Sequence, residues 1–532
     1  MVMSTMSMAH FLLILASLSW VSSQLTSPQI NSQWYKDGEN VLKQKLNAKN
    51  IEKTGKNAIL FIGDGMSIPT EVCARIFQGQ KRGQTGEENN LSWQLFPNVG
   101  LSKTYSVDFQ VPDSAATATA FLSGVKTNDG VLGLNQNGIK GQCASEKNNH
   151  VNSLVAIAEE LGMSTGIITT ARVTHATPGA AYSHCASRNW EANIPSSQAG
   201  LGCKDIATQL LDAYNIGDGF EVVMGGGRCN FHSINTTDPE YTTSKGCRFD
   251  GKDLIQEWKN KKLSNSAYVW NLTAFNAIDP NKTDHLLGLF DPSHMKYDAD
   301  RLTDKAGEPS IAQMTEKAIQ ILQRNPKGYF LFVEGGRIDH SHHSGVAYGA
   351  ITDTIAMADA VQKAVAMTNP QETLIVVTAD HGHTLSMSGY PKRGNPILGL
   401  VDGAPSLDGK PYTTINYANG PGAIKDGELR PNLTGVDVQA RLHEQQAIFP
   451  IIYETHDGAD VGIYSQGPFA HLLTGVVEQS YIFHAMKHAL CLGPNSNVPN
   501  CQRFVTRGSA VSSVASNMLL LVIMLCLVKF LQ

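Results

Sequence analysis

The chain has 532 residues and a formal net charge of −5, from 42 Lys and Arg against 47 Asp and Glu. This balance and the lack of a basic run exclude nucleic acid as the expected partner, so any anionic substrate must be attracted locally, for example by metal ions. The length could hold several average domains, but one large α/β domain with insertions is also common at this size.

The first 23 residues have the pattern of a secretory signal peptide. An apolar stretch runs from Phe11 to Trp20, and the small residues that follow suit cleavage before Gln24. The segment departs from the usual pattern because no Lys or Arg precedes the apolar stretch. We expect the protein to enter the secretory pathway.

Four short apolar segments are predicted to be buried strands, and polar residues follow each of them. They are residues 57–65, which include Asp64; 163–170, before His175; 329–333, before Glu334; and 373–378, before Asp380 and His381. Helical patterns at 151–161 and 311–324 lie between these strands. Such alternation predicts an α/β fold, a three-layer sandwich with a mostly parallel central sheet. Ligands bind beyond the carboxyl ends of such strands, where the polar residues converge.

A candidate nucleophile lies in the segment from Val111 to Gly124. Small residues predict a helix there that ends at glycine, with Ser114 in its first turn. Free backbone N–H groups favour a phosphate at that position, and a nearby metal could ionise the hydroxyl. For an isolated Asp-Ser pair, however, the better interpretation is that Asp113 or Ser114 only caps the helix.

A candidate metal site lies between Val333 and His343, which we interpret as a strand that leads into a loop. This run contains two carboxylates and three imidazoles without a cysteine, which favours zinc, magnesium or manganese. The alternative is a polar surface loop with solvated histidines. Residues from about 387 to 453 are richer in Gly, Pro and Asn and lack the alternation, so we interpret them as an inserted subdomain.

The apolar tail from Met518 to Leu531 has two interpretations: a single transmembrane helix or a glycolipid (GPI) anchor signal that is removed. About fourteen residues is short for a span, which needs roughly 20. We therefore favour a GPI signal at 509–532 behind a catalytic domain at 24–508. The attachment residue is open among Gly508, Ser509 and Ala510, and Ser509 is our choice. This predicts anchoring at the extracellular face of the cell membrane.

Sequons and cysteines also fit a secreted protein. Five Asn-x-Ser/Thr sequons are candidate glycosylation sites: Asn90, Asn235, Asn271, Asn281 and Asn432. Of nine cysteines, Cys526 lies in the tail, and the even remainder indicates disulfides in an oxidising compartment. Proximity suggests a pair of Cys229 with Cys247 and another of Cys491 with Cys501, although sequence leaves the connectivity open.

Four sequence motifs, taken in chain order, resemble those of the animal membrane-bound alkaline phosphatases. They are Pro112 to Ala115, Val333 to His340, Thr378 to His381 and Glu454 to Gly458. The resemblance runs from about Trp34 to Cys501 and implies an alkaline phosphatase-like fold with an inserted crown-like subdomain. It also implies disulfides between Cys143 and Cys203 and between Cys491 and Cys501.

Carried over residue by residue, the resemblance implies two zinc ions and one magnesium ion. Asp339, His343 and His456 resemble the ligands of one zinc; Asp64, Asp380 and His381 those of the second; and Asp64, Thr177 and Glu334 those of magnesium, with His175 at its water shell. Arg188 resembles the residue that holds phosphate oxygens. With these ligand sets filled, His340, His342 and His383 are interpreted as supporting or structural residues. A possible calcium site would use Glu240, the Phe290 carbonyl, Asp291 and Glu308, with Asp291 where the family has a longer Glu.

The resulting interpretation is a phosphomonoesterase with broad specificity, in which Ser114 forms a phosphoserine intermediate. Family resemblance also implies an alkaline optimum and a homodimer in which a helix from Trp34 to Leu46 reaches the partner. Rival interpretations are a related phosphodiesterase, a sulfatase, and a GPI-anchored binding protein. No Cys/Ser-x-Pro-x-Arg run is present for a sulfatase nucleophile.

Overall fold

The computed structural model describes residues 25–214, 216–261, 263–403 and 406–493. The predicted signal peptide, Cys501, Cys526, Ser509 and the rest of the tail lie outside these residues. The chain divides into two units, residues 1–49 and 50–532. Within the described part, no helix is long and apolar enough to cross a membrane.

The first unit contains two helices, α2 (Ser27–Asn31) and α3 (Gln33–Asn47). The helix that resemblance implied from Trp34 to Leu46 is thus present. Its apolar side chains Trp34, Leu42 and Leu46 are exposed in this single chain.

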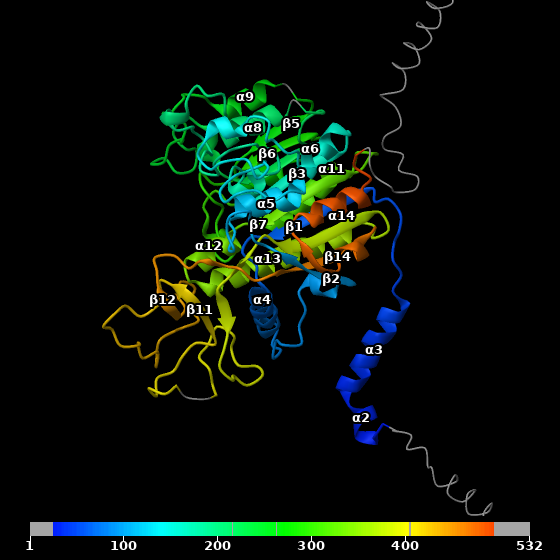
Figure 1. Ribbon diagram of the computed structural model, residues 1–532, viewed down its shortest axis with the longest axis vertical. Helices are drawn as coiled ribbons and strands as arrows, with labels where there is room; N and C mark the ends of the chain where they lie inside the picture. Colours follow the sequence, from blue (N-terminus) through cyan, green and yellow to red (C-terminus); the bar gives the residue numbers. More distant parts are fainter. Residues whose placement is uncertain (1–24, 215, 262, 404–405, 494–532) are drawn as a thin grey trace, which may run out of the picture. The chain divides into compact units, whose positions relative to one another are not determined.

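The second unit is built around a ten-stranded sheet, which confirms the predicted α/β class (Figure 1). In spatial order its strands are β15 (Gly475–Glu478), β2 (Asn98–Lys103), β14 (Val461–Gln466), β8 (Thr373–Ala379), β1 (Asn57–Gly63), β7 (Tyr329–Gly335), β3 (Ser164–Arg172), β4 (Val222–Gly226), β6 (His285–Leu289) and β5 (Ser266–Val269). Every neighbouring pair is parallel except those of β14, which runs antiparallel to β2 and β8. All four predicted strands, including residues 57–65, are present and lie side by side in the order β8, β1, β7, β3.

Helices cover both faces because the central strands are apolar on both sides. In β1, Leu60 and Ile62 belong to one hydrophobic core, whereas Ile59 and Phe61 belong to the other. The first core contains residues of α5 (Ser114–Ser123), α6 (Leu154–Glu160), α7 (Ala176–Gly179), α8 (Ile206–Ala213), α9 (Leu254–Asn260) and α14 (Tyr481–Ala489). The second contains residues of α4 (Ile68–Lys81), α10 (Leu272–Asn276), α11 (Ile311–Leu322), α12 (Arg337–His343) and α13 (Ala347–Met367).

Smaller elements complete the fold. A three-stranded sheet, β10 (Leu385–Met387), β11 (Ile415–Gly420) and β12 (Ala447–Pro450), lies within or beside the segment that we interpreted as an insertion. A two-stranded sheet joins β9 (Gly382–His383) to β13 (His456–Asp457) and so brings His456 to the end of β8. In the described part of the chain, short 3-10 helices span Ser92–Leu95, Cys143–Glu146, Ser196–Gln198, Arg228–Phe231, Arg301–Thr303 and Ala470–Leu473.

Candidate active site

Ser114 is the first residue of α5, as predicted. The Asp113 side chain caps the helix by accepting a hydrogen bond from Ala116 N at 3.1 Å, and Gly124 ends it in the left-handed conformation. The hydroxyl is therefore held at the helix N-terminus, where backbone N–H groups favour an anion. Ser114 is 1% exposed, and its Oγ lies 3.2 Å from His381 Nε2. Asp113 therefore caps the helix, and Ser114 occupies the first helical position, where its hydroxyl could react.

The carboxyl ends of three adjacent strands bring four polar residues together. Ile62 of β1 is opposite both Glu334 of β7 and Thr378 of β8, so Asp64, Glu334, Asp380 and His381 share one edge of the sheet. His381 Nε2 lies 3.1 Å from Asp380 Oδ2 and 3.6 Å from Asp64 Oδ1. Backbone N–H groups of Gly65 and His381 donate to Asp380 Oδ1, each at 2.9 Å. This leaves Asp380 Oδ2 directed at the imidazole.

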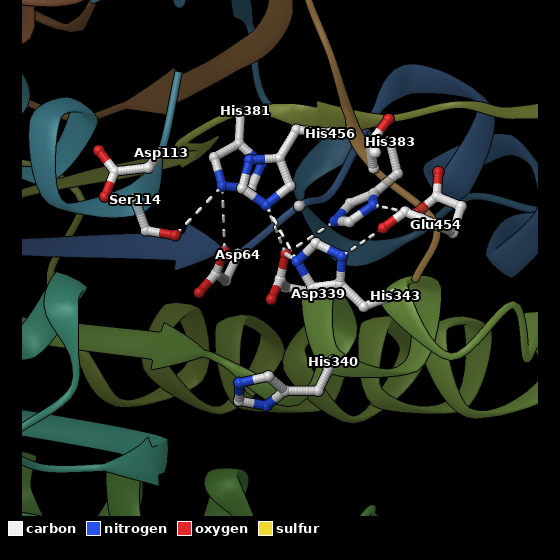
Figure 2. A network of polar contacts seen from close by, with 12 residues as sticks. Asp64, Asp113, Ser114, Asp339, His340, His343, His381, His383, Glu454 and His456 are labelled. Carbon is white, nitrogen blue, oxygen red and sulfur yellow. Dashed lines mark hydrogen bonds and ion pairs between the residues drawn. The ribbon is translucent and has the colours of Figure 1, made fainter. Parts of the chain in front are cut away.

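A second group forms around Asp339, as Figure 2 shows. Asp339 Oδ1 lies 3.3 Å from His343 Nε2 and 3.2 Å from His456 Nε2, and the two imidazole nitrogens are 3.1 Å apart. The opposite nitrogens contact the carbonyls of Glu454 at 2.5 Å and Pro112 at 2.8 Å. Because a carbonyl can only accept, each Nδ1 carries the proton and each Nε2 presents its lone pair to the centre.

The passage after β7 is a helix rather than the loop that we predicted. Residues 337–343 form α12, with Ile338 buried in the core. The glycine pair and high polarity suggested a loop, but a helix places Asp339 and His343 one turn apart on the same face. That spacing explains how one short segment supplies two members of the site.

Buried atoms without partners show that the residues fit metal ions. Both carboxylate oxygens of Asp64, together with Asp380 Oδ2, Glu334 Oε1 and Thr177 Oγ1, are buried and have no hydrogen-bond partner. Native proteins rarely leave such groups unsatisfied, and a bound cation would satisfy them. Ligand atoms of Asp339, His343, His383 and His456 lie within 4.8 Å of one another, as do those of Asp64, His175 and Glu334.

The burial and crowding of these carboxylates also shift their pKa values. Burial, and then repulsion from Asp380, Asp339 and Glu334, raises the pKa of Asp64 well above its usual value. Burial opposes ionisation of Asp339 as well, but His343, His383 and His456 hold its pKa well below the usual range. The crowded carboxylates are therefore stable as anions only with compensating positive charge.

Arg188 lies beside the nucleophile and is oriented by two contacts. Its Nη1 donates to Asp113 Oδ2 at 3.0 Å, and its Nη2 donates to His175 Nε2 at 3.2 Å. Asp113 therefore connects the helix that carries Ser114 to the guanidinium that we expected to hold phosphate.

Three further histidines lie around these residues, and we predicted a supporting or structural role for each. His383 Nε2 lies 2.7 Å from Asp339 Oδ1, and its Nδ1 lies 2.5 Å from Glu454 Oε2. His342 contacts Thr70 Oγ1 at 3.0 Å and Tyr417 OH at 2.8 Å, so both of its nitrogens are used away from the centre. His340 instead lies beside His175 and His294, with ring centroids 5.3 and 4.1 Å away.

Sequence reasoning missed several residues of the site. Thr169 donates a hydrogen bond to Glu334 Oε2, and Gln479 donates to the Asp380 carbonyl at 2.7 Å. Glu454 accepts from Thr384 N at 2.8 Å in addition to its contact with His383. Glu454 lies in one of the sequence motifs that indicated the site. Thr169 lies inside a strand and Gln479 in a distant segment, and no motif in the sequence marks either of them.

The predicted calcium residues occupy one region without forming a tight cluster. Glu240 accepts from Arg228 Nη2 at 3.1 Å, Asp291 pairs with Lys296 Nζ at 2.8 Å, and Glu308 accepts from Lys296 N at 2.9 Å. Within the described residues, these carboxylates belong to no group of three ligand atoms within 4.8 Å. Burial raises the pKa of Glu240 to about 7 and that of Glu308 to about 8, and the negative charge of Asp304, which is not one of the predicted calcium residues, adds to both shifts.

Disulfides join Cys143 to Cys203 and Cys229 to Cys247, as expected. Cys73 and Cys185 are buried free thiols. Cys501, the expected partner of Cys491, lies outside the described residues. Of the sequons, Asn90, Asn235, Asn281 and Asn432 are exposed, whereas half-buried Asn271 caps α10 by accepting from Ala274 N at 2.8 Å.

Comparisons with known proteins agree with this geometry. Residues 55–492 match the family model described as alkaline phosphatase. The chain is 46% identical to the tissue-nonspecific alkaline phosphatase of Rattus norvegicus over 87% of this chain and 89% of the relative. It is also 46% identical to the alkaline phosphatase of Gadus morhua, over 89% and 99%. The human tissue-nonspecific isozyme is 43% identical over 92% and 93%.

Solved structures show the same fold. The alkaline phosphatase of Thermus thermophilus matches with a TM-score of 0.60 and 22% identity, over 88% of this chain and 96% of that chain. The enzyme of the Antarctic bacterium TAB5 matches with a TM-score of 0.56 and 21% identity, over 83% and 99%.

Proposed function

Because this chain belongs to the alkaline phosphatase family and hydrolyses phosphate monoesters, we propose that Ser114 is the nucleophile and that two zinc ions and one magnesium ion complete the site. The observation that carries the proposal is the position of Ser114. Its Oγ is 3.2 Å from His381 Nε2, at a helix N-terminus, beside an arginine and a group of unsatisfied carboxylates. The site thus combines a nucleophile with groups that bind a phosphate dianion.

The donor types support a specific assignment of ions. Asp339, His343 and His456 would hold one zinc, and Asp64, Asp380 and His381 the other, because mixed nitrogen and oxygen donors suit zinc. Asp64, Thr177 and Glu334 offer only oxygen, which suits magnesium. When bound, these ions would lower the pKa of the serine hydroxyl and stabilise the departing alkoxide.

Side chains of the protein supply the nucleophile and hold the phosphate. Ser114 attacks phosphorus and displaces the alcohol, which gives a phosphoserine while Arg188 holds the phosphoryl oxygens. Asp113 fixes Arg188 for this task through their 3.0 Å contact. Water then attacks from the side that the alcohol has left, so two inversions give net retention at phosphorus.

An acid quench during turnover tests the nucleophile. We expect mass spectrometry to find phosphate on Ser114, and Ser114→Ala to lose this label and nearly all activity. Ser123→Ala is a matched control because Ser123 ends the same helix and its buried Oγ has no hydrogen-bond partner. Label on another residue, or a fully active Ser114→Ala enzyme, would overturn the assignment.

We further propose an extracellular, GPI-anchored homodimer with broad specificity. The two disulfides indicate an oxidising compartment, and the exposed apolar residues of α3 offer a contact for a second copy. Phosphatidylinositol-specific phospholipase should release the protein from membranes, and retention after complete digestion would reject the anchor. Glu240, the Phe290 carbonyl, Asp291 and Glu308 remain our proposed calcium site, which metal analysis of purified protein can test.

A further inference from the structure

A cluster of basic and imidazole side chains lies beside the proposed phosphate clamp, and the reaction does not use most of it. We define the arginine-histidine cluster as Arg172, His175, His294, Arg337 and His340. The rings of His175, His294 and His340 are neighbours, with centroid distances of 5.3, 5.3 and 4.1 Å. His175 also contacts Arg188, so the cluster is continuous with the phosphate clamp.

Three imidazoles this close could suggest another metal site. The hydrogen bonds argue against it, because an arginine N–H can only donate. Arg188 Nη2 lies 3.2 Å from His175 Nε2, Arg172 Nη1 lies 2.5 Å from His294 Nε2, and Arg337 Nη1 lies 3.1 Å from His340 Nδ1. Each of these lone pairs is therefore directed at a guanidinium rather than at an ion.

The cluster instead has more hydrogen-bond donors than acceptors. A neutral imidazole that accepts at one nitrogen carries a proton on the other, so His175 Nδ1 and His340 Nε2 are donors. His175 is 8% exposed, and its Nδ1 has no partner. His294 faces Arg172 through both nitrogens, with Arg172 N at 3.3 Å from its Nδ1, so this ring orients Arg172 and leaves His175 Nδ1 and His340 Nε2 as the donors that need a partner. An acceptor bound here would satisfy these groups.

Charge favours an anionic acceptor. Glu191 neutralises Arg172 through a pair at 2.6 Å, and Asp113 neutralises Arg188. Among the described residues, Arg337 is in no ion pair within 4.0 Å, and its buried Nε has no hydrogen-bond partner. Its guanidinium instead lies 3.8 Å from the centre of the Tyr297 ring. Arg337 therefore contributes a positive charge that no carboxylate pairs with directly, although Asp353 interacts with it electrostatically.

We propose that the arginine-histidine cluster is a second anion subsite, which binds a second phosphate group of the substrate while Arg188 holds the phosphate to be cleaved. This inference rests on the proposed role of Arg188. The His175 ring separates the two subsites, so the adjacent phosphates of a pyrophosphate are too close together to occupy both. The favoured substrates are bisphosphate monoesters whose two phosphates are separated by a spacer of several bonds.

A matched pair of substrates tests the proposal on the metal-loaded enzyme. We expect 1,6-hexanediol bisphosphate to have a kcat/KM at least about fivefold higher than 6-hydroxyhexyl monophosphate, after correction for its two equivalent ends. His294→Asp should remove this preference because it places a carboxylate against the second phosphate. His294→Asn, which adds no charge and keeps an acceptor for Arg172, should retain part of it.

The measured quantity is the ratio of kcat/KM for the bisphosphate to kcat/KM for the monophosphate. A general loss of activity lowers both values and leaves this ratio unchanged. Lys282→Gln is the charge-matched control, since Lys282 is an exposed residue before β6, at the opposite end of that strand from Asp291. Its ratio should equal that of the wild type. An enzyme that hydrolyses the monophosphate but shows no preference, or a ratio unchanged in His294→Asp, would reject the subsite and leave the proposed function standing.

Discussion

At the scale of single residues, Arg188 is held in place before any substrate arrives. Asp113 and His175 fix two of its nitrogens, at 3.0 and 3.2 Å. A fixed planar fork loses little conformational freedom when it binds phosphate oxygens, which favours the transition state. The cost of losing this side chain should therefore appear mainly in phosphate binding and transition-state stabilisation, rather than in formation of the intermediate.

We expect Arg188→Ala to lower kcat/KM by about 2–4 kcal/mol of transition-state stabilisation, roughly 30- to 1,000-fold, while phosphoserine still forms. Arg188→Lys should recover only part of the loss because an ammonium cannot bind two oxygens as a fork. Steady-state kinetics with p-nitrophenyl phosphate and acid-quenched mass spectrometry measure the two effects. A fully active lysine variant would show that the fork geometry is unimportant.

At the scale of elements, helix α5 and the phosphate clamp depend on one carboxylate. Asp113 accepts from Ala116 N at the start of the helix and from Gly130 N at 2.9 Å, and it pairs with Arg188. Although burial opposes ionisation, Arg188 and these N–H groups keep the pKa of Asp113 below its ordinary value. The helix end and the arginine therefore stabilise the same anion.

Two substitutions of Asp113 should separate the contribution of its helix cap from that of its charge. We expect Asp113→Ala to destabilise the metal-loaded protein by about 2 kcal/mol, the upper end for a lost helix cap. Asp113→Asn keeps the Oδ1 acceptor and should lose less than half as much. Differential scanning calorimetry of both variants at one zinc concentration gives the comparison, and equal losses would show that capping contributes little.

A buried carboxyl pair, formed by Glu159 near the end of α6 and Glu221 just before β4, should make stability depend on pH. Burial and the neighbouring Glu159 raise the pKa of Glu221 to about 8, and burial raises that of Glu159 to about 7. Both pKa values exceed the usual 4.5, so the folded protein binds more protons than the unfolded chain between pH 4.5 and 8. Stability should fall as pH rises through this window and level off above it.

Glu221→Gln should weaken this dependence, since each pKa unit corresponds to about 1.4 kcal/mol. The variant should be less stable than the wild type or equal to it at pH 5, because it loses a hydrogen bond from Ser164 or Thr165. Relative to the wild type it should gain stability by pH 9. Thermal unfolding at pH 5, 7 and 9 tests this, and a difference that stays constant with pH would contradict the assignment.

At the scale of the whole molecule, the features that could be predicted from the sequence are those that local patterns determine. Buried strands such as Tyr329–Gly335 and the polar residues at their ends were predictable because parallel strands place their carboxyl ends at one edge. The antiparallel insertion of β14 between β8 and β2 was not, since it depends on contacts between segments far apart in sequence. His294 was missed for the same reason: its significance comes from His175 and His340, which follow β3 and β7 and lie beside it only in the folded chain.

The convergence of these strands gives the metal-free protein a destabilising group of like charges. Asp64 is fully buried, and Asp380, Asp339 and Glu334 all disfavour its ionised form. Metal ions should reverse this effect, because ligands that bind only the folded state add about 2.7 kcal/mol of stability at a hundredfold excess over Kd. One substitution should therefore have opposite effects in the two states.

We expect Asp64→Asn to leave metal-free protein equally or more stable than the wild type, because it removes a charge from the crowded carboxylates. With zinc and magnesium it should be less stable and nearly inactive, since it loses a charged ligand shared by two proposed metal sites. Calorimetry and p-nitrophenyl phosphate turnover before and after chelation, with metal content checked by elemental analysis, provide the test. Asp426→Asn, an exposed change of the same charge, should show no such reversal. If Asp64→Asn gains as much thermal stability from the metals as the wild type, Asp64 is not a ligand, and full turnover by metal-free wild type would exclude metal dependence altogether.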